Sequence, residues 1–348
     1  MASIHEVAKA AGVSISTVSY ALSGKRSIGA DTRRRIDAAV AELGYRANAG
    51  ARMLAGSRTN ILALTAPLHE DTYHPAHMRF VMAVTKAARA RDYDTLLLVQ
   101  DDATAGLERV TSSALADGVV VLDLDMHDER IERLRSLGAR SVFVGIPEDT
   151  TGLRCVDLDF EAAAALAVDR LADAGRQSIG LVGHPEGLYG RGSNFPLRFR
   201  RGFGEAVERR GVAHAEVYPE ETRAATRSAV ATLVERLPEF DGLVLNCNEP
   251  VARAILAELT SRGIDVPGAV SVVAGGANYS TRDFAPPLDV IPLIAEESCE
   301  RAIELLVESI EHGDAGELVE LIAPRYVTRG SVVARAASEA SPQTGARV

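Results

Sequence analysis

The chain has 348 residues, of which 47% are hydrophobic and 25% charged, a balance typical of a globular protein with roughly two or three domains. No run of about 18 apolar residues is present to cross a bilayer, so the sequence excludes an integral membrane protein and predicts no membrane partner. The start MASIHEVAKAAGVS has no apolar secretory signal, and the three cysteines are widely separated. Both features favour the cytoplasm.

Charge is unevenly distributed along the chain. Residues 1–59 carry nine basic and four acidic side chains, whereas the remainder carries 29 basic and 44 acidic ones. The formal net charge of the whole chain is -10. A basic head on an acidic body fits a polyanionic partner, such as DNA, for the head alone.

The first predicted elements are three short helices. Ser3 and Glu6 are spaced as a capping box for a helix over 4–11, and Gly12 can take the positive φ of a tight turn. Ser14 can cap a second helix over 15–23, and a third helix follows Gly29 and stops at Gly44. We expect the core between these helices to contain Val7, Val18 and Leu22, with Ile36, Val40 and Leu43 on one face of the third helix.

This order of elements is a helix-turn-helix with a supporting third helix, a geometry in which the second helix enters the major groove of DNA. Its outward positions are Ile15, Ser16, Ser19, Tyr20 and Ser23. Hydroxyl groups can bond phosphates or base edges, and Ile15 and Tyr20 can contact thymine methyl groups. The alternative is an ordinary helical hairpin in which the serines only cap helices.

The runs IHEVAKAAGVSISTVSYALSG, TRRRIDAAVAELGY and ARMLAG, with Asn48 before the last, resemble the DNA-binding head and hinge of the LacI/GalR family of bacterial transcription regulators. The resemblance implies that Ser14 and Thr17 contact phosphates and that Ile15 and Ser16 read base edges. It extends the DNA-contacting set to Thr32 and to the hinge residues Asn48, Ala51 and Leu54. Leu54 would enter a minor-groove base step and bend the duplex.

From Ile61 onward, short apolar runs alternate with segments of helical spacing. The runs are ILALT, TLLLV, GVVVL, SVFV, SIGLV, GLVLN and VSVVA, and the helical segments include 77–90, 161–174, 199–210 and 249–261. This is the βαβ rhythm of parallel sheets. About ten strands favour two doubly wound subdomains with a ligand cleft at the carboxyl ends of the strands.

The stretches RGIDVPGAVSVVAGGANY and YVTRGS resemble the periplasmic-binding-protein-like core of the same family. The predicted fold class is therefore α/β with a small all-α N-terminal head. The resemblance implies crossings between the subdomains near 157–160, 285–290 and 318–324. The expected units are a head (1–47), a hinge helix and linker (48–60), a core (61–335) and a flexible tail (336–348). Within the core, we expect subdomain one at 61–157 and 290–318 and subdomain two at 158–285 and 323–335.

Strand ends supply the candidate effector-binding residues, which are Tyr73, His74, Asp101, Arg198, Arg200, Asn246, Glu249 and Asn278. Carboxylate, amide and guanidinium groups suit a polyhydroxylated ligand, because each hydroxyl needs a donor and an acceptor. The resemblance also implies a sugar, with an Arg before GF contacting it, and the register leaves Arg198 and Arg200 both open. Because the chain has no Trp, stacking would fall to Tyr73, Phe160, Phe195 or Tyr279.

Other chemistries find little support in the sequence. Three nearby histidines could belong to a metal site, namely His69, His74 and His77. No cysteine or Glu/His motif completes such a site, so we expect neither a metal nor a cofactor. No GxSxG, HExxH or Walker motif is present, so no enzymatic activity is expected.

The sequence therefore predicts a cytoplasmic, homodimeric transcription regulator that binds a pseudo-palindromic double-stranded operator. We expect a repressor of carbohydrate-use genes that is released or modulated by a small sugar-like effector between the core subdomains. A sugar-binding carrier without gene control is the alternative, and it leaves the basic head unexplained.

Overall fold

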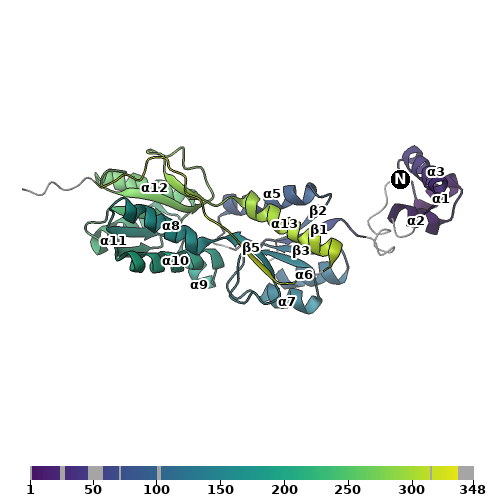
Figure 1. The fold of residues 1–348 in the computed structure, drawn as a ribbon, viewed down its shortest axis with the longest axis horizontal. Helices are drawn as coiled ribbons and strands as arrows, with labels where there is room; N and C mark the ends of the chain where they lie inside the picture. Colours follow the sequence, from purple (N-terminus) through teal and green to yellow (C-terminus); the bar gives the residue numbers. More distant parts are fainter. Residues whose placement is uncertain are drawn as a thin grey trace, which may run out of the picture.

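The computed structural model describes residues 2–23, 28–45, 58–69, 72–99, 103–313 and 316–335. Figure 1 shows a small helical head and a core of two α/β subdomains joined by crossing segments of the chain. The predicted fold class is confirmed: both core sheets are parallel, and helices lie on both faces of each.

The head consists of α1 (Ile4–Ala11), α2 (Ile15–Ser23) and α3 (Ala30–Leu43). The Ser3 and Glu6 capping box forms as expected, and Gly12 takes a φ of 65° in the turn before α2. Val7, Val18 and Ile36 are fully buried between the helices.

Two of the expected core residues of the head lie elsewhere. Leu22 is 40% exposed and Leu43 is also exposed, so neither contributes to the buried core. Ala21, Ala39 and Tyr45 are buried there instead. Leu22 lies one position beyond the buried Val18–Ala21 face of α2, and that step of about 100° turns it toward the flank of the helix.

The first subdomain contains a six-stranded parallel sheet in the order β11-β5-β4-β3-β1-β2. Its strands are β1 (Ile61–Thr65), β2 (Asp94–Leu98), β3 (Gly118–Val121), β4 (Ser141–Val144), β5 (Arg154–Leu158) and β11 (Leu318–Ile322). One face is covered by α5 (His74–Arg89) and α13 (Ala295–His312), and the other by α6 (Ala103–Ser112) and α7 (Glu129–Leu137). The period of two along each strand sets these layers: Leu62 and Leu64 pack toward α5 and α13, whereas Ala63 packs toward α6 and α7.

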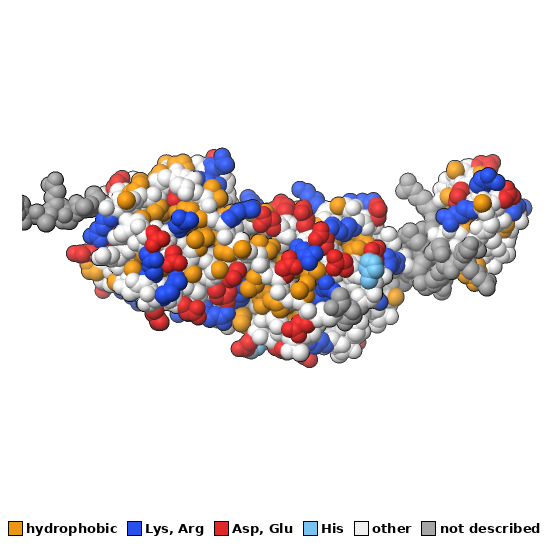
Figure 2. Space-filling view, viewed as in Figure 1, with side chains coloured by type: hydrophobic (Ala, Val, Ile, Leu, Met, Phe, Trp, Pro, Cys, Tyr) orange, Lys and Arg blue, Asp and Glu red, His pale blue; other side chains and the backbone are white. Residues whose placement is uncertain are grey.

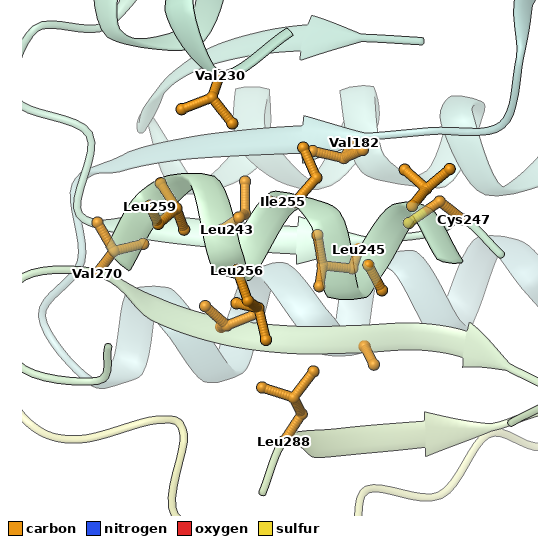
Figure 3. Packing of buried hydrophobic residues seen from close by; sticks show 14 of the residues in the cluster. Val182, Val230, Leu243, Leu245, Cys247, Ile255, Leu256, Leu259, Val270 and Leu288 are labelled. Atoms are coloured by element: carbon orange, nitrogen blue, oxygen red, sulfur yellow. The ribbon is translucent and has the colours of Figure 1, made fainter. Parts of the chain in front are cut away.

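The second subdomain contains a five-stranded parallel sheet in the order β10-β9-β8-β6-β7. Its strands are β6 (Ser178–Val182), β7 (Ala213–Val217), β8 (Gly242–Leu245), β9 (Ser271–Ala277) and β10 (Asp289–Pro292). Its helices are α8 (Phe160–Asp173), α9 (Glu186–Arg191), α10 (Asn194–Arg210), α11 (Arg223–Arg236) and α12 (Glu249–Ser261). Figure 3 shows Ile255, Leu256 and Leu259 of α12 packing on Leu243 and Leu245 of β8.

The chain passes between the subdomains three times, but one passage lies later than expected. β10 belongs to the second sheet, so the second passage falls between Pro292 and Ala295 rather than at 285–290. Asp289 explains this placement, because its buried carboxylate accepts backbone N–H bonds from Gly330 (2.6 Å) and Ser331 (3.0 Å). These bonds hold β10 against the returning segment 323–335 of the second subdomain.

Candidate functional site

The front of α2 presents a cluster of hydroxyl groups. Ser14 accepts a hydrogen bond from the Thr17 backbone N–H (3.1 Å), and its hydroxyl lies 2.8 Å from those of Ser16 and Thr17. These groups gather at the positive end of a helix, where backbone N–H groups and the helix dipole favour a phosphate. The cap therefore starts the helix and also gathers hydroxyl groups that can donate to an anion.

The remaining predicted DNA-contacting residues divide between described and undescribed parts of the chain. Ile15, Ser16 and Tyr20 are exposed, Thr17 and Ser19 are half-buried, and Thr32 is half-buried on α3. The side chain of Ser23 and the hinge residues Asn48, Ala51 and Leu54 lie outside the described residues.

One arginine fixes the turn of the helix-turn-helix to its supporting helix. Arg35 of α3 donates from Nη1 to the Ala11 carbonyl (3.1 Å) at the end of α1. Because α2 begins only four residues later, this bond helps to set the direction in which α2 leaves the turn.

The second candidate site is a cavity of about 140 Å³ between the two core subdomains. The first subdomain contributes Thr72, Tyr73, Ala76, His77, Phe80, Leu122, Asp123, Leu124, Val144, Gly145 and Asp157. The second contributes Phe160, His184, Leu188, Arg191, Asn194, Phe195, Cys247, Asn248, Gly276 and Asn278, and Leu293 comes from the second crossing. The cavity lies at the carboxyl ends of the strands, the position expected for a ligand in open α/β sheets.

Direct polar contacts join the two walls of this cavity. The Arg191 guanidinium of the second subdomain lies 3.1 Å from Asp125 and 3.7 Å from Asp123 of the first. The Met126 backbone N–H donates to the Gly192 carbonyl (2.7 Å). We call the contacts between residues 123–126 and 191–194 the latch, because they hold one side of the cleft closed.

Asn194 belongs to the latch and lines the cavity as well. Its backbone N–H donates to the Leu124 carbonyl (3.1 Å), which also accepts a bond from Asn194 Nδ2 (2.5 Å). Asn194 Oδ1 accepts the Ile146 backbone N–H (3.4 Å). On another side of the cleft, Arg79 of α5 donates to the Asn278 carbonyl.

His184 stands out in the wall formed by the second subdomain. It follows β6, is only 8% exposed, and packs edge-on against the ring of Phe195 with the centroids 5.1 Å apart. Burial lowers the pKa of His184 to about 4, so the ring is neutral at pH 7. The described residues give the imidazole no hydrogen bond, and Nδ1 is shielded from solvent. A neutral imidazole has one donor and one acceptor to offer.

The opposite wall carries His77 and Asp123. Burial lowers the pKa of His77, and its Nε2 has no hydrogen-bond partner among the described residues. Asp123 adopts a φ of 51°, a backbone conformation that Asp and Asn tolerate better than most residues. Arg130 fixes this conformation by donating to the Asp123 carbonyl (2.7 Å) and by pairing with Asp128 (2.6 Å).

Arg198 lies behind the cavity wall and not on its surface. Its guanidinium is buried and contacts Asp157 (2.8 Å), Glu161 (3.1 Å) and the Leu158 carbonyl (3.2 Å). Burial raises the pKa of Asp157 to about 7, and the Arg198 guanidinium opposes that rise. Phe199, the next residue on α10, is fully buried. Arg198 therefore holds Asp157, whose side chain lines the cavity, and has no open position for a ligand.

Two of the predicted effector contacts, Tyr73 and Asn278, line the cavity. The other described candidates do not line the cavity. Arg200 faces outward and pairs with Glu216 (3.0 Å), and Glu249 pairs with Arg253 (2.7 Å).

Asn246 and His74 complete this set. Asn246 is buried beneath the wall and donates to the Gly275 carbonyl (3.0 Å), while His74 is exposed at the start of α5. Asp101 lies outside the described residues. The stacking candidates Phe160 and Phe195 do line the cavity, with centroids 5.7 Å apart.

The sequence reasoning missed His184, Asn194 and Arg191. His184 follows the run SIGLV by two residues, so the strand-end rule would have found it. No local signal identifies the other two, because they face the cavity only where α9 and α10 meet the 123–126 loop of the other subdomain.

Metal ligation and membrane spanning are two further properties of the described part of the chain. Within those ranges, no group of three or more His, Cys, Asp or Glu side chains is placed to hold a metal ion. Nor does any helix there combine the length and apolar character needed to cross a membrane.

Comparison with known proteins agrees with both parts of the molecule. Residues 3–48 match the model of the bacterial regulatory proteins of the lacI family, and residues 168–332 match a periplasmic binding protein-like domain. The transcriptional repressor PurR of Mannheimia succiniciproducens is 27% identical over 346 residues, covering 95% of this chain and 99% of that protein.

Solved structures share the whole fold. The lac repressor dimer bound to operator and an anti-inducer aligns over 96% of this chain and 99% of that one, with a TM-score of 0.78 and 19% identity. The complex of the regulator CelR with cellobiose aligns over 95% and 100%, with a TM-score of 0.66 and 23% identity. The chain therefore combines a helix-turn-helix head of the lacI family with a periplasmic-binding-protein-like core, the arrangement found in the LacI-family regulators that it resembles.

Proposed function

We propose that this protein represses carbohydrate-use genes and that a small sugar bound between its core subdomains controls its affinity for operator DNA. The observation that carries the proposal is a cavity with polar and aromatic walls between the subdomains of a chain whose head is a helix-turn-helix. The protein would act in the cytoplasm, where its DNA target lies.

The composition of the cavity wall supports a sugar. Asn194, Asn248, Asn278 and Tyr73 offer donors and acceptors, and the rings of Phe160 and Phe195 offer an apolar face. A sugar ring needs both, because its hydroxyls form hydrogen bonds and its C–H face packs against aromatic rings. The related regulator CelR has been solved with cellobiose, which supports the same ligand class here.

A homodimer is proposed from an exposed apolar strip on the first subdomain. Met78 and Met82 of α5 are exposed, Met82 by 49%, and so are Leu96 and Leu97 of the edge strand β2 with Val99 just beyond. An apolar strip beside an unpaired strand edge is typical of a protein interface. A two-fold axis through it would present two heads to a pseudo-palindromic operator.

DNA reading is assigned to the head alone. Figure 2 shows basic and acidic side chains interspersed over the visible face of both core subdomains, whereas the head has a positive excess. We propose that Ser14, Thr17 and Thr32 bind phosphates and that Ile15, Ser16, Ser19, Tyr20 and Ser23 face the bases. Asn48, Ala51 and Leu54 are proposed to contact the minor groove.

Control by the ligand would operate through the cleft. The latch and the Arg79 contact set the angle between the subdomains, and a ligand that fits only one angle shifts the equilibrium toward it. Such couplings typically amount to about 1–3 kcal/mol, or roughly 5–150-fold in DNA affinity. The same coupling must act in reverse, so operator DNA must change sugar affinity by the same factor.

The test is fluorescence anisotropy of the full chain on DNA from the region upstream of its own gene, with random DNA as competitor. We expect specific binding that one sugar changes, and Tyr20→Ala should weaken it by about tenfold. Arg200→Ala, in the second subdomain, should leave DNA affinity unchanged. Equal affinity for upstream and random DNA at every salt concentration would contradict the proposal, and sugar binding without DNA binding would favour a carrier.

A further inference from the structure

We infer that the cavity is selective for a compact, uncharged, single-ring ligand. We also infer that His184 favours a ring that carries a hydroxyl beside it over a ring that does not. This inference rests on the proposed function, because it specifies which ligand the regulatory cleft accepts. It follows from the charges around the cavity, from the unused hydrogen-bonding capacity of the His184 imidazole, and from the volume of the cavity.

The guanidinium groups around the cavity are already held by carboxylates. Arg191 is held by Asp123 and Asp125, and Arg198, behind the wall, by Asp157 and Glu161. The cavity is lined by no lysine among the described residues, and Arg79 at its rim is engaged by a backbone carbonyl. A phosphate entering this space would meet Asp123 and Asp157, and Arg191, the one arginine among the described lining residues, is already paired with two carboxylates.

Helix N-termini near the cavity offset this only in part. The start of α8 is occupied by Asp159, which accepts the Ala162 N–H (2.9 Å), and α12 carries Glu249 in its first turn. At the start of α10, the Asn194 N–H is taken by the Leu124 carbonyl. These three termini are already shared with an acceptor, whereas α5, whose first residues line the cavity, has no acidic residue in its first turn and can donate to a ligand oxygen.

His184 supplies a polar contact that the protein itself leaves unused. Its ring lies in the wall beside Phe195, is almost fully buried, and forms no hydrogen bond with the described residues. Nδ1 is shielded from solvent, so a ligand in the cavity would meet the other ring nitrogen, Nε2, and a hydrogen bond to Nε2 would add to the affinity of that ligand. A ligand whose ring places a hydroxyl beside His184 should therefore bind more tightly than a ligand that places a C–H group there.

The space is nearer in size to one sugar ring than to two. A cavity of about 150 Å³ takes a molecule the size of benzene, and this one measures about 140 Å³ with the latch closed. Phe160, Phe195 and Leu293 close the apolar side of the space. A disaccharide would require the contacts of Arg191 with Asp123 and Asp125 to break.

The inference is tested by calorimetric titration of the full chain with aldopentoses and aldohexoses, with their 5- or 6-phosphates, and with cellobiose and maltose. We expect at least one neutral monosaccharide to bind and its phosphate ester to bind at least about tenfold more weakly. Tighter binding of the ester than of its parent sugar, binding of a disaccharide alone, or no binding by any neutral monosaccharide would overturn the inference.

Two variants test the roles of His184 and the acidic wall. His184→Leu should weaken the sugar by about tenfold, while His184→Gln, which keeps a donor and an acceptor, should retain most of the affinity. Asparagine tolerates the positive φ at position 123 as aspartate does, so Asp123→Asn removes the negative charge without changing the backbone. We expect this variant to prefer the neutral sugar over its phosphate ester by a smaller factor than wild type does. Equal sugar affinity of His184→Leu and wild type, with unchanged thermal unfolding of both, would refute the role of His184.

Operator binding is measured in parallel without sugar. If the protein binds its operator but no neutral monosaccharide, only this inference is overturned. If the protein shows no specific DNA binding, the proposed function itself is refuted.

Discussion

Replacing Gly202 by alanine tests how closely the two helices beside the cavity pack. Gly202 lies inside α10 against α8, and a Cβ built there would stand 2.4 Å from the Glu161 carbonyl oxygen and 2.5 Å from the Glu161 Cα. Ordinary van der Waals contact begins near 3.4 Å, so the helices would have to separate by about 1 Å. The clash is with backbone, which no side-chain rotation relieves.

The magnitude follows from two opposing terms. Overpacking of a buried contact typically costs about 1–3 kcal/mol or more, and the higher end applies because backbone must move. Alanine gains about 1 kcal/mol over glycine in a helix. We therefore expect Gly202→Ala to lower the free energy of unfolding of the core by about 2 kcal/mol, and its melting temperature by several degrees.

Gly204 provides a matched control on the same helix. An added Cβ at Gly204 meets no atom within 4 Å, so Gly204→Ala should raise stability by about 0.5–1 kcal/mol through helix propensity alone. Urea and thermal unfolding followed by circular dichroism compare the two variants with wild type. If Gly202→Ala were as stable as Gly204→Ala, the close approach of α8 and α10 would be refuted.

Three further predictions concern other parts of the molecule. Arg130→Met should lower the free energy of unfolding by about 3–5 kcal/mol, measured by urea denaturation, because Asp128 would stay buried without its partner. His184 has a folded pKa of about 4 against 6.5, so the unfolded chain takes up its proton first and stability is lost as pH falls from about 6.5 to 4. Relative to His184→Gln, the free energy of unfolding of wild type should fall by up to about 3 kcal/mol over that pH range. Asp157 has a raised pKa and gives the opposite pH dependence, but its effect cancels because both proteins contain it. Met82→Glu should dissociate the proposed dimer in sedimentation, and an unchanged mass would place the interface elsewhere.

Much of the head could be predicted because its determinants are local. The Ser3–Glu6 capping box, the turn at Gly12 and the stop at Gly44 each depend on residues within a few positions of one another. Leu22 and Leu43 were misjudged, since periodicity gives the face of a helix but not which part of that face its neighbours cover.

The strands β5, β7, β10 and β11 were not identified from the sequence, and in β11 the apolar run LVELI is interrupted by Glu320. RCVDL, AHAEV and DVIP contain charged or polar residues among few apolar ones, so no apolar run marks them. They become strands because neighbouring strands offer a hydrogen-bonding edge, which is a property of the assembled sheet.

The candidate effector site shows the same division. Local residue patterns were enough to predict a helix-turn-helix head on a two-subdomain α/β core, because caps, turns and hydrophobic periods encode that architecture. The packing of the two subdomains turns Arg198 inward onto Asp157, joins Asn194 to the 123–126 loop and places His184 in the wall of the same cavity. These residues are brought together by three chain crossings and the packing of two separate sheets, and no spacing in the sequence records that convergence.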